Sequence, residues 1–95
     1  MPKGYVIARV DVHDAEAYAK YAAAAGEAIR AHNGRPLARG GRSEALEGPG
    51  RRRNVVIEFE SYEQARAYYH SAAYQAAKAM REGAAEMEMV VVEGV

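Results

Sequence analysis

The chain has 95 residues, of which 49% are hydrophobic and 27% are charged, so it is long enough for one hydrophobic core and too short for two domains. Its 13 basic and 13 acidic residues give a formal net charge of zero, which excludes an overall field that would attract nucleic acid or an anionic membrane. The absence of cysteine excludes disulfides, thiolate catalysis and cysteine-ligated metals.

The sequence predicts a soluble, cytoplasmic protein with one domain over residues 1–95. Its first five residues contain no apolar segment of the signal-peptide kind, and no apolar run approaches the roughly 20 residues that span a membrane. The lack of cysteine fits a reducing compartment. We therefore expect neither a membrane partner nor a nucleic-acid partner.

Residues 5–12 alternate in the way of a strand with one apolar and one mixed face. The apolar face holds Val6, Ala8, Val10 and Val12, and the mixed face holds Tyr5, Ile7, Arg9 and Asp11. An alanine-rich helix is predicted next, with Asp14 as its N-cap and Asn33-Gly34 as a left-handed stop. Gly26 weakens the middle of this helix by up to about 1 kcal/mol.

Residues 35–39 predict a short strand, and Pro36 places it at a sheet edge, where a missing N–H is tolerated. Gly40-Gly41 is expected to break or bulge this strand. After a turn at residues 47–50, the basic run 51–53 is interpreted as a solvated entry to the next strand.

The most apolar strand candidate is 55–59, with Val55, Ile57 and Phe59 on one face and Asn54, Val56 and Glu58 on the other. It leads into a helix at Ser61, where a reciprocal capping box with Gln64 is predicted. The buried stripe of this helix is expected to contain Ala65, Tyr68, Tyr69 and Ala72.

A helix break is predicted near His70-Ser71, followed by a shorter helix that ends at about Arg81 and is closed by Gly83. Residues 87–92 form the last predicted strand. It is apolar on both faces, which indicates that both faces are covered.

The order strand, helix, strand, strand, helix, strand predicts an α+β, ferredoxin-like βαββαβ sandwich, an antiparallel sheet with both helices on one face. The crossover rule places the first and third strands side by side in the centre, and we expect them to run parallel. The other face exposes an apolar patch around Tyr5, Ile7 and Val56. Such a patch predicts a C2 homodimer.

The chain resembles the domain of unknown function 1330 family over almost its whole length. The resemblance rests on these segments in order: Gly4–Ala8, Arg39-Gly40-Gly41, Glu47-Gly48, Val55–Phe59 with Ser61, Ser71 before Tyr74-Gln75, and Val91–Gly94. It implies a dimeric α/β barrel, in a superfamily that includes cofactor-free monooxygenases and muconolactone-isomerase-like proteins. It implies no particular reaction. Many relatives carry proline after the serine that Ser71 matches, whereas this chain has Ala72.

Glu58 is the first candidate catalytic residue. As a carboxylate in an apolar strand it would act as a general base beside a carbonyl. The alternative is a structural ion pair with Arg9 or Arg39. His70 is a second acid–base candidate at the helix break, beside Tyr69 and Tyr74, with an inert helical histidine as the alternative.

Arg39-Gly40-Gly41-Arg42 is a candidate binding segment for an anionic group, because guanidinium matches carboxylate and glycine lets the backbone approach. A glycine bulge on an edge strand is the alternative. The candidate ligand-binding residues are therefore Arg9, Arg39, Gly40, Gly41, Tyr69 and Tyr74. No pair of histidines has metal-ligand spacing, so we expect no metal and no cofactor.

Three functions stay open from the sequence. The first is binding of a small anionic or carbonyl-bearing metabolite in a polar-lined cavity near Arg39, Glu58 and His70. The second is a cofactor-free isomerase or monooxygenase-like reaction. The third is a structural or interaction dimer without a ligand.

Overall fold

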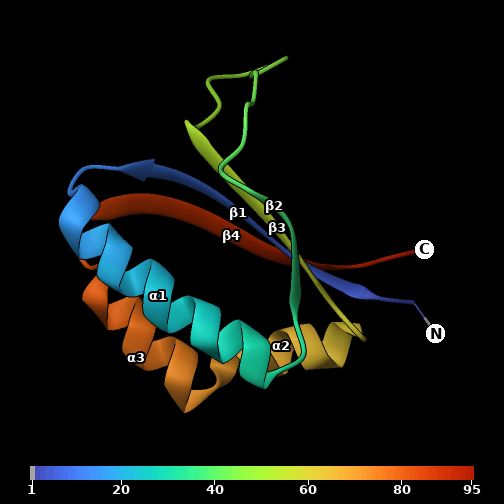
Figure 1. The fold of residues 1–95 in the computed structure, drawn as a ribbon. Helices are drawn as coiled ribbons and strands as arrows, with labels where there is room; N and C mark the ends of the chain where they lie inside the picture. Colours follow the sequence, from blue (N-terminus) through green and yellow to red (C-terminus); the bar gives the residue numbers. More distant parts are fainter. Residues whose placement is uncertain (1) are drawn as a thin grey trace.

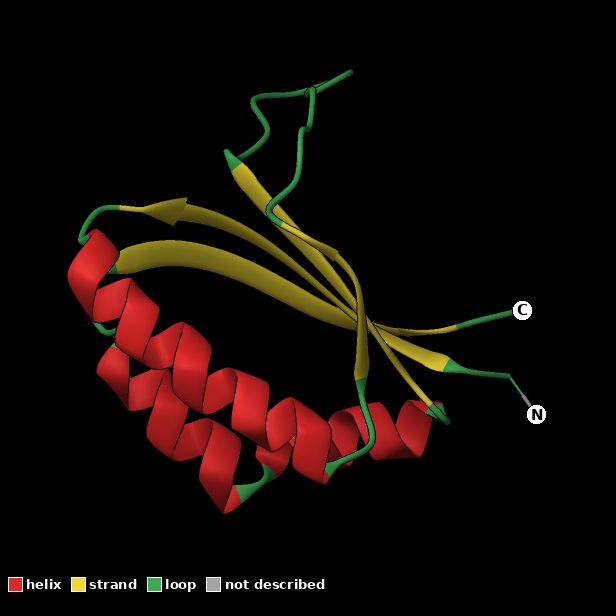
Figure 2. Ribbon diagram, in the orientation of Figure 1, coloured by secondary structure: helices red, strands yellow, loops and turns green. Residues whose placement is uncertain are grey.

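The computed structural model describes residues 2–95, and its elements follow the predicted order (Figures 1 and 2). They are β1 (Gly4–Val12), α1 (Ala15–Ala31), β2 (Arg35–Arg39), β3 (Arg53–Phe59), α2 (Tyr62–His70), α3 (Ala72–Met80) and β4 (Ala85–Glu93). In the described part of the chain, no helix is both long and apolar enough to cross a membrane.

The four strands form one sheet in the order β2-β3-β1-β4, and all neighbouring strands are antiparallel. The prediction that β1 and β3 lie side by side in the centre is confirmed, but the prediction that they run parallel is wrong. Each helical crossover joins two parallel strands with a third strand between them, so the neighbours in the centre run in opposite directions. All three helices lie on one side of the sheet (Figure 2). The ferredoxin-like α+β fold is thus confirmed.

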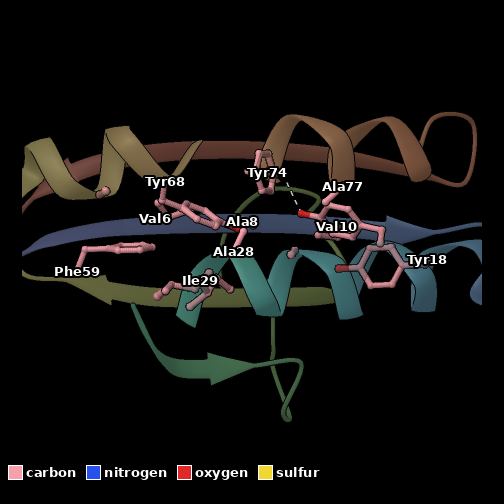
Figure 3. Close-up of a cluster of buried hydrophobic side chains, with 14 residues drawn as sticks. Val6, Ala8, Val10, Tyr18, Ala28, Ile29, Phe59, Tyr68, Tyr74 and Ala77 are labelled. Atoms are coloured by element: carbon pink, nitrogen blue, oxygen red, sulfur yellow. Dashed lines mark hydrogen bonds between the residues drawn. The ribbon is translucent and has the colours of Figure 1, made fainter. Parts of the chain in front are cut away.

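The core lies between the helices and the inner face of the sheet (Figure 3). The alternation predicted for β1 and β3 is confirmed, since the inward residues Val6, Val10 and Phe59 are almost fully buried. The helices contribute a cluster of aromatic rings, with the Tyr68 centroid 5.1 Å from Phe59 and 4.9 Å from Tyr74. This layer holds the helices on the sheet.

The helix ends follow the predicted caps with one exception. The Asp14 side chain accepts from the Ala17 N–H at 3.1 Å, and Asn33 closes α1 with a φ of 59°. Ser61 Oγ accepts from the Gln64 N–H at 3.0 Å. The predicted return hydrogen bond from the Gln64 side chain to the Ser61 N–H is wrong. The Gln64 amide instead donates to the His32 carbonyl at 3.1 Å, and this contact joins α2 to the end of α1.

The predicted break near His70-Ser71 is confirmed, because α2 ends at His70 and α3 begins at Ala72. Ser71 is extended at φ −68°, ψ 151°, and its hydroxyl caps α3 by accepting from the Tyr74 N–H at 3.1 Å. Because of this break, the buried positions of α3 do not continue the helical spacing of the buried positions of α2. Ala72 is therefore exposed, against the prediction that it is buried, and Tyr74 and Ala77 are buried instead.

The outer face of the sheet is uncovered in the single chain. β4 was expected to be covered on both faces, but its outward residues Val90 and Val92 are 54% and 43% exposed. They pair across the sheet with Ile7 and Tyr5 of β1. An apolar band therefore runs over the side of the sheet opposite the helices.

Strand β2 lies at an edge, as Pro36 predicts, and it ends directly before Gly40, so the predicted break at Gly40-Gly41 is confirmed. A bulge is also present, but it lies earlier in the strand. The pairing with β3 shifts between Pro36 and Ala38, so Leu37 is the extra residue. A one-residue bulge exchanges the faces of the residues beyond it. Arg35 consequently pairs with Glu58 on the outer face, whereas Arg39 pairs with Val55 on the inner face.

Candidate functional site

The predicted site residues do not form one cavity. Glu58 and Arg9 lie on the outer face, Arg39 lies on the inner face, and Tyr69 and His70 lie beside the edge strand β4. The expectation of one cavity near Arg39, Glu58 and His70 is therefore wrong. The bulge at Leu37 is the reason that Arg39 and Glu58 separate.

Glu58 is held by neighbours on both adjacent strands. Its Oε1 accepts from Arg35 Nη2 at 2.8 Å, and its Oε2 accepts from the Tyr5 hydroxyl at 3.3 Å. The ion pair predicted for Glu58 exists, but its partner is Arg35 rather than Arg9 or Arg39. The Glu58 side chain is only 17% exposed, whereas that of Arg35 is 72% exposed. These two contacts connect Glu58 of β3 to β2 and to β1.

Arg9 lies on the same outer face as Glu58 but farther along β1, opposite Asn54 and Glu88. It lines a shallow surface hollow with the loop residues Gly48 and Gly50. Arg9 is exposed and, within residues 2–95, forms no ion pair with Glu58.

An inner cavity of about 70 Å³ lies between α1 and the inner face of the sheet. Its walls are mainly apolar and aromatic, and among them are Tyr18, Ala22 and Gly26 of α1 and Val55 of β3. Two arginines, Arg39 and Arg53, also line it. Arg39 is exposed and Arg53 is half-buried, so the two guanidinium groups mark the mouth of the cavity.

Arg53 is the site residue that the sequence interpretation missed. Its guanidinium lies over the Tyr18 ring at 5.5 Å from the centroid. Its Nε is buried and has no hydrogen-bond partner among the described residues. The signal was available, because Arg53 precedes Val55 by two residues and therefore shares its inward face. The interpretation of residues 51–53 as a solvated entry is wrong for Arg51 and Arg53, which are half-buried.

The two glycines after Arg39 differ in their surroundings. Gly40 has a φ of 74°, and its N–H donates to the Asn54 carbonyl at 3.0 Å. A side chain at Gly40 would collide with the guanidinium of Arg53. Gly41 is exposed and has open space around it. Gly40 therefore makes room for Arg53, and Gly41 has no such role.

A second hollow, the edge pocket, has a volume of about 320 Å³. It is lined by Tyr69 and His70 of α2, the β4 residues Met89–Val91, and Val6. The Tyr69 hydroxyl accepts from Lys78 Nζ at 3.0 Å. This hydrogen bond lowers the pKa of Tyr69 from its ordinary value because the ammonium stabilises the phenolate.

Tyr74 belongs to the core rather than to a ligand site. It is fully buried, and its hydroxyl lies 2.9 Å from that of Tyr21, the dashed line in Figure 3. Burial raises the pKa of Tyr21 well above its ordinary value, so its hydroxyl stays neutral.

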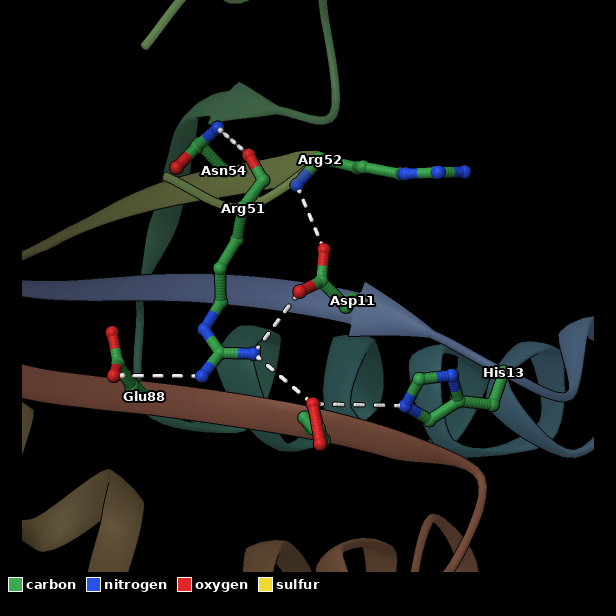
Figure 4. Close-up of polar contacts among 7 residues, drawn as sticks. Asp11, His13, Arg51, Arg52, Asn54 and Glu88 are labelled. Carbon is green, nitrogen blue, oxygen red and sulfur yellow. Dashed lines mark hydrogen bonds and ion pairs between the residues drawn. The ribbon is translucent and has the colours of Figure 1, made fainter. Parts of the chain in front are cut away.

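The outer face ends in a charged cluster centred on Arg51 (Figure 4). Arg51 reaches Asp11 at 3.1 Å, Glu86 at 3.6 Å and Glu88 at 3.5 Å. Asp11 also accepts from the Arg52 N–H at 3.0 Å. These contacts tie the loop between β2 and β3 to β1 and β4. Within residues 2–95, no three histidine or acidic side chains come together as a metal site.

The fold and the cavity define a ferredoxin-like α+β protein with a small arginine-lined hollow between helix and sheet. Its structure is similar to that of a protein of unknown function from Rhodopseudomonas palustris, with a TM-score of 0.77 and 18% identity over 99% of this chain and 83% of that one. A dimeric ferredoxin-like protein of unknown function from Thermobifida fusca gives a TM-score of 0.63 and 16% identity over 97% and 91%.

SnoaB, a cofactor-independent oxygenase from Streptomyces nogalater, gives a TM-score of 0.59 and 14% identity over 97% of this chain and 92% of that one. A comparison with curated proteins gives no match. The match that identifies the family covers residues 3–95, and the chain belongs to the domain of unknown function family DUF1330.

Proposed function

We propose that the protein binds a small anionic molecule at the mouth of the inner cavity. The observation that carries this proposal is the pair Arg39 and Arg53, neither of which forms an ion pair within residues 2–95. None of the described residues that line the cavity is acidic. A buried donor without an acceptor is unfavourable, and an anion at this mouth would satisfy it.

A thermal-shift screen tests the binding. Small carboxylates, phosphates and their uncharged analogues are added to the wild type and to Arg39→Gln, Arg53→Gln and Arg52→Gln. Arg52 is the matched control, because its side chain is exposed and lines neither hollow. Anions should stabilise the wild type and Arg52→Gln but not the other two variants. Equal responses from all four proteins would contradict the proposal, and no response from the wild type would favour a dimer without a ligand.

We also propose that the chain is one cytoplasmic domain that forms a homodimer through the outer face. The band of Tyr5, Ile7, Val90 and Val92 supports this, because an apolar face of this kind is commonly buried by a second subunit. The similar protein from Thermobifida fusca is described as dimeric. A second copy of the chain is the occupant that would cover the band symmetrically.

Sedimentation measures this assembly directly. The wild type should sediment as a dimer at micromolar concentration, and Ile7→Glu should shift it to a monomer by placing a charge in the band. Ala73→Glu is the control, since Ala73 is exposed on the helical side. A monomeric wild type would end the proposal.

A second candidate function, a cofactor-free isomerase or oxygenase, is favoured by the edge pocket. There Tyr69, with its lowered pKa, lies beside His70 and would move a proton to or from an activated carbonyl or quinol. SnoaB is described as a cofactor-independent oxygenase. The test is turnover of a panel of quinols and carbonyl compounds without added metal or flavin. Tyr69→Phe should abolish the turnover, whereas Tyr62→Phe should retain it.

A further inference from the structure

Gly26 occupies the middle of α1, in a segment otherwise rich in alanine. Glycine weakens a helix interior relative to alanine, so its presence there needs a reason. Close packing is not the reason, because a β-carbon at this position would meet only Arg30 Nη1, at the ordinary van der Waals distance of 3.8 Å. Gly26 instead lines the inner cavity. The missing side chain leaves the cavity open on the α1 side.

The opposite side of the mouth is fixed by Arg53. Its guanidinium lies over Tyr18 and fills the space that Gly40 leaves free. The planar guanidinium presents its donors in a geometry that matches a carboxylate. Arg39, on the same inner face, supplies a second guanidinium. The cationic groups thus stand at the entrance, and the apolar walls lie behind them.

The size of the cavity limits the part of the ligand that is attached to the anionic group. About 70 Å³ is far below the roughly 300 Å³ or more of pockets that bind drug-sized ligands. A nucleotide or a sugar phosphate does not fit in such a space. The walls include Ala22, Ile57, Met87 and Met89, which offer a polar tail at most a weak sulfur acceptor. The hydroxyls in the lining belong to Tyr18, Tyr21 and Tyr68, and that of Tyr21 is already paired with Tyr74 at 2.9 Å. The part of the ligand inside the cavity must therefore be short and apolar.

We infer that Gly26 is a specificity-determining residue and that the inner cavity takes a short aliphatic monocarboxylate. The carboxylate lies between Arg39 and Arg53, and the hydrocarbon tail enters beneath Gly26. This inference rests on the proposed anion binding and adds the class of the ligand. Because each buried methylene strengthens binding about fourfold, butyrate should bind about fifteenfold more tightly than acetate.

The experiment is an amide NMR titration of the full-length protein as purified, with acetate, butyrate, butyramide and inorganic phosphate as probes. The wild type is compared with Gly26→Leu, which fills the opening, and Gly26→Ala, which adds a single methyl group. Ala22→Leu is a second filling variant one turn earlier on α1, in case Gly26→Leu does not fold. Circular dichroism establishes which variants are folded.

Butyrate should shift the Gly26 amide of the wild type, and butyramide should not. In a folded filling variant, butyrate affinity should fall about tenfold or more, to the level of acetate, while acetate changes by less than about twofold. Unchanged butyrate affinity in the filling variants would overturn the role of Gly26, and a wild type that binds phosphate but no carboxylate would overturn the ligand class. Neither result would affect anion binding itself, whereas a wild type that binds no anion would remove the proposed function.

Discussion

Arg51 and Arg53 are two residues apart, but their side chains lie in different environments on opposite faces of the sheet. Arg51 lies over the outer face, where Asp11, Glu86 and Glu88 surround its guanidinium. Arg53 lies on the inner face, over an aromatic ring, with an unpartnered buried Nε. The first arginine is neutralised by its own chain. The second is not, and this difference distinguishes a charge used for structure from a charge available to a ligand.

The same contrast holds for the two sides of the sheet. On the inner side, stability comes from packed rings and a buried hydroxyl pair. On the outer side, the described contacts are ion pairs at both ends of an exposed apolar band. Ion pairs at a surface that water reaches contribute little individually, so packing changes should have larger effects than charge changes.

The largest effect is expected from the inner layer. Tyr74→Ala removes a fully buried ring that contacts Tyr68 and Tyr21, and it should lower the free energy of unfolding by about 3–5 kcal/mol. Urea denaturation followed by circular dichroism measures this change. The control is Tyr62→Ala, at a half-buried position at the start of α2, which should lose less than half as much. Equal losses would show that the inner layer does not dominate stability.

The hydroxyl pair of Tyr21 and Tyr74 gives the next effect. Tyr74→Phe leaves the buried Tyr21 hydroxyl without its partner and should cost about 1–3 kcal/mol of unfolding free energy. Tyr21→Phe should cost less, because the Tyr74 hydroxyl keeps its contact with Met89 Sδ at 4.0 Å. The double variant should cost less than the sum of the two, because neither hydroxyl is then left behind. A double-mutant cycle in urea provides the comparison, and strict additivity would contradict a direct interaction.

Local chemistry made most of the fold predictable. Asp14, Ser61 and Ser71 cap helices in the structure as their side chains suggest, and the alternation of apolar residues identified the inward faces of β1 and β3. The relative direction of β1 and β3 was missed because it depends on how two crossovers interleave. That arrangement is a property of the whole chain rather than of any segment.

The site was less predictable because one residue reverses the faces of β2. Without the bulge at Leu37, Arg35 and Arg39 would share a face, and Arg39 would lie on the Glu58 side of the sheet. Nothing local marks Leu37 as the bulged residue, whereas Gly40 and Gly41 are of the residue type that favours a bulge. Arg53 was missed for a different reason. It was interpreted together with its basic neighbours as solvated, although the alternation of β3 places it on the inner face.

A direct comparison of the two arginines should give a smaller effect. Arg51→Met leaves three carboxylates without their shared cation and should lower stability, with partial recovery in 1 M salt as repulsion is screened (Debye length about 3 Å). Arg53→Met removes an unpartnered donor and keeps an apolar stem over Tyr18, so stability should change by less than about 1 kcal/mol. Arg52→Met is the control in the same urea experiments. A larger loss at Arg53 than at Arg51 would reverse the comparison.

The smallest effect is a dependence of stability on pH that comes from Asp11 on the outer face. The Arg52 N–H, together with the Arg51 guanidinium, holds the pKa of Asp11 below its ordinary value. A carboxyl whose folded-state pKa is lowered stabilises the fold fully above its unfolded pKa of about 3.9, and this contribution disappears as the pH falls through the folded-state pKa. Urea denaturation of the wild type and Asp11→Asn from pH 6 to pH 2 should therefore give a stability difference that is constant at first and then shrinks. The other carboxylates titrate in both proteins, so the difference isolates Asp11.

Glu44→Gln, at an exposed loop position without an ion pair in residues 2–95, should show no such trend. A difference that grows toward low pH would mean that Asp11 does not bind Arg51 and Arg52 as an anion.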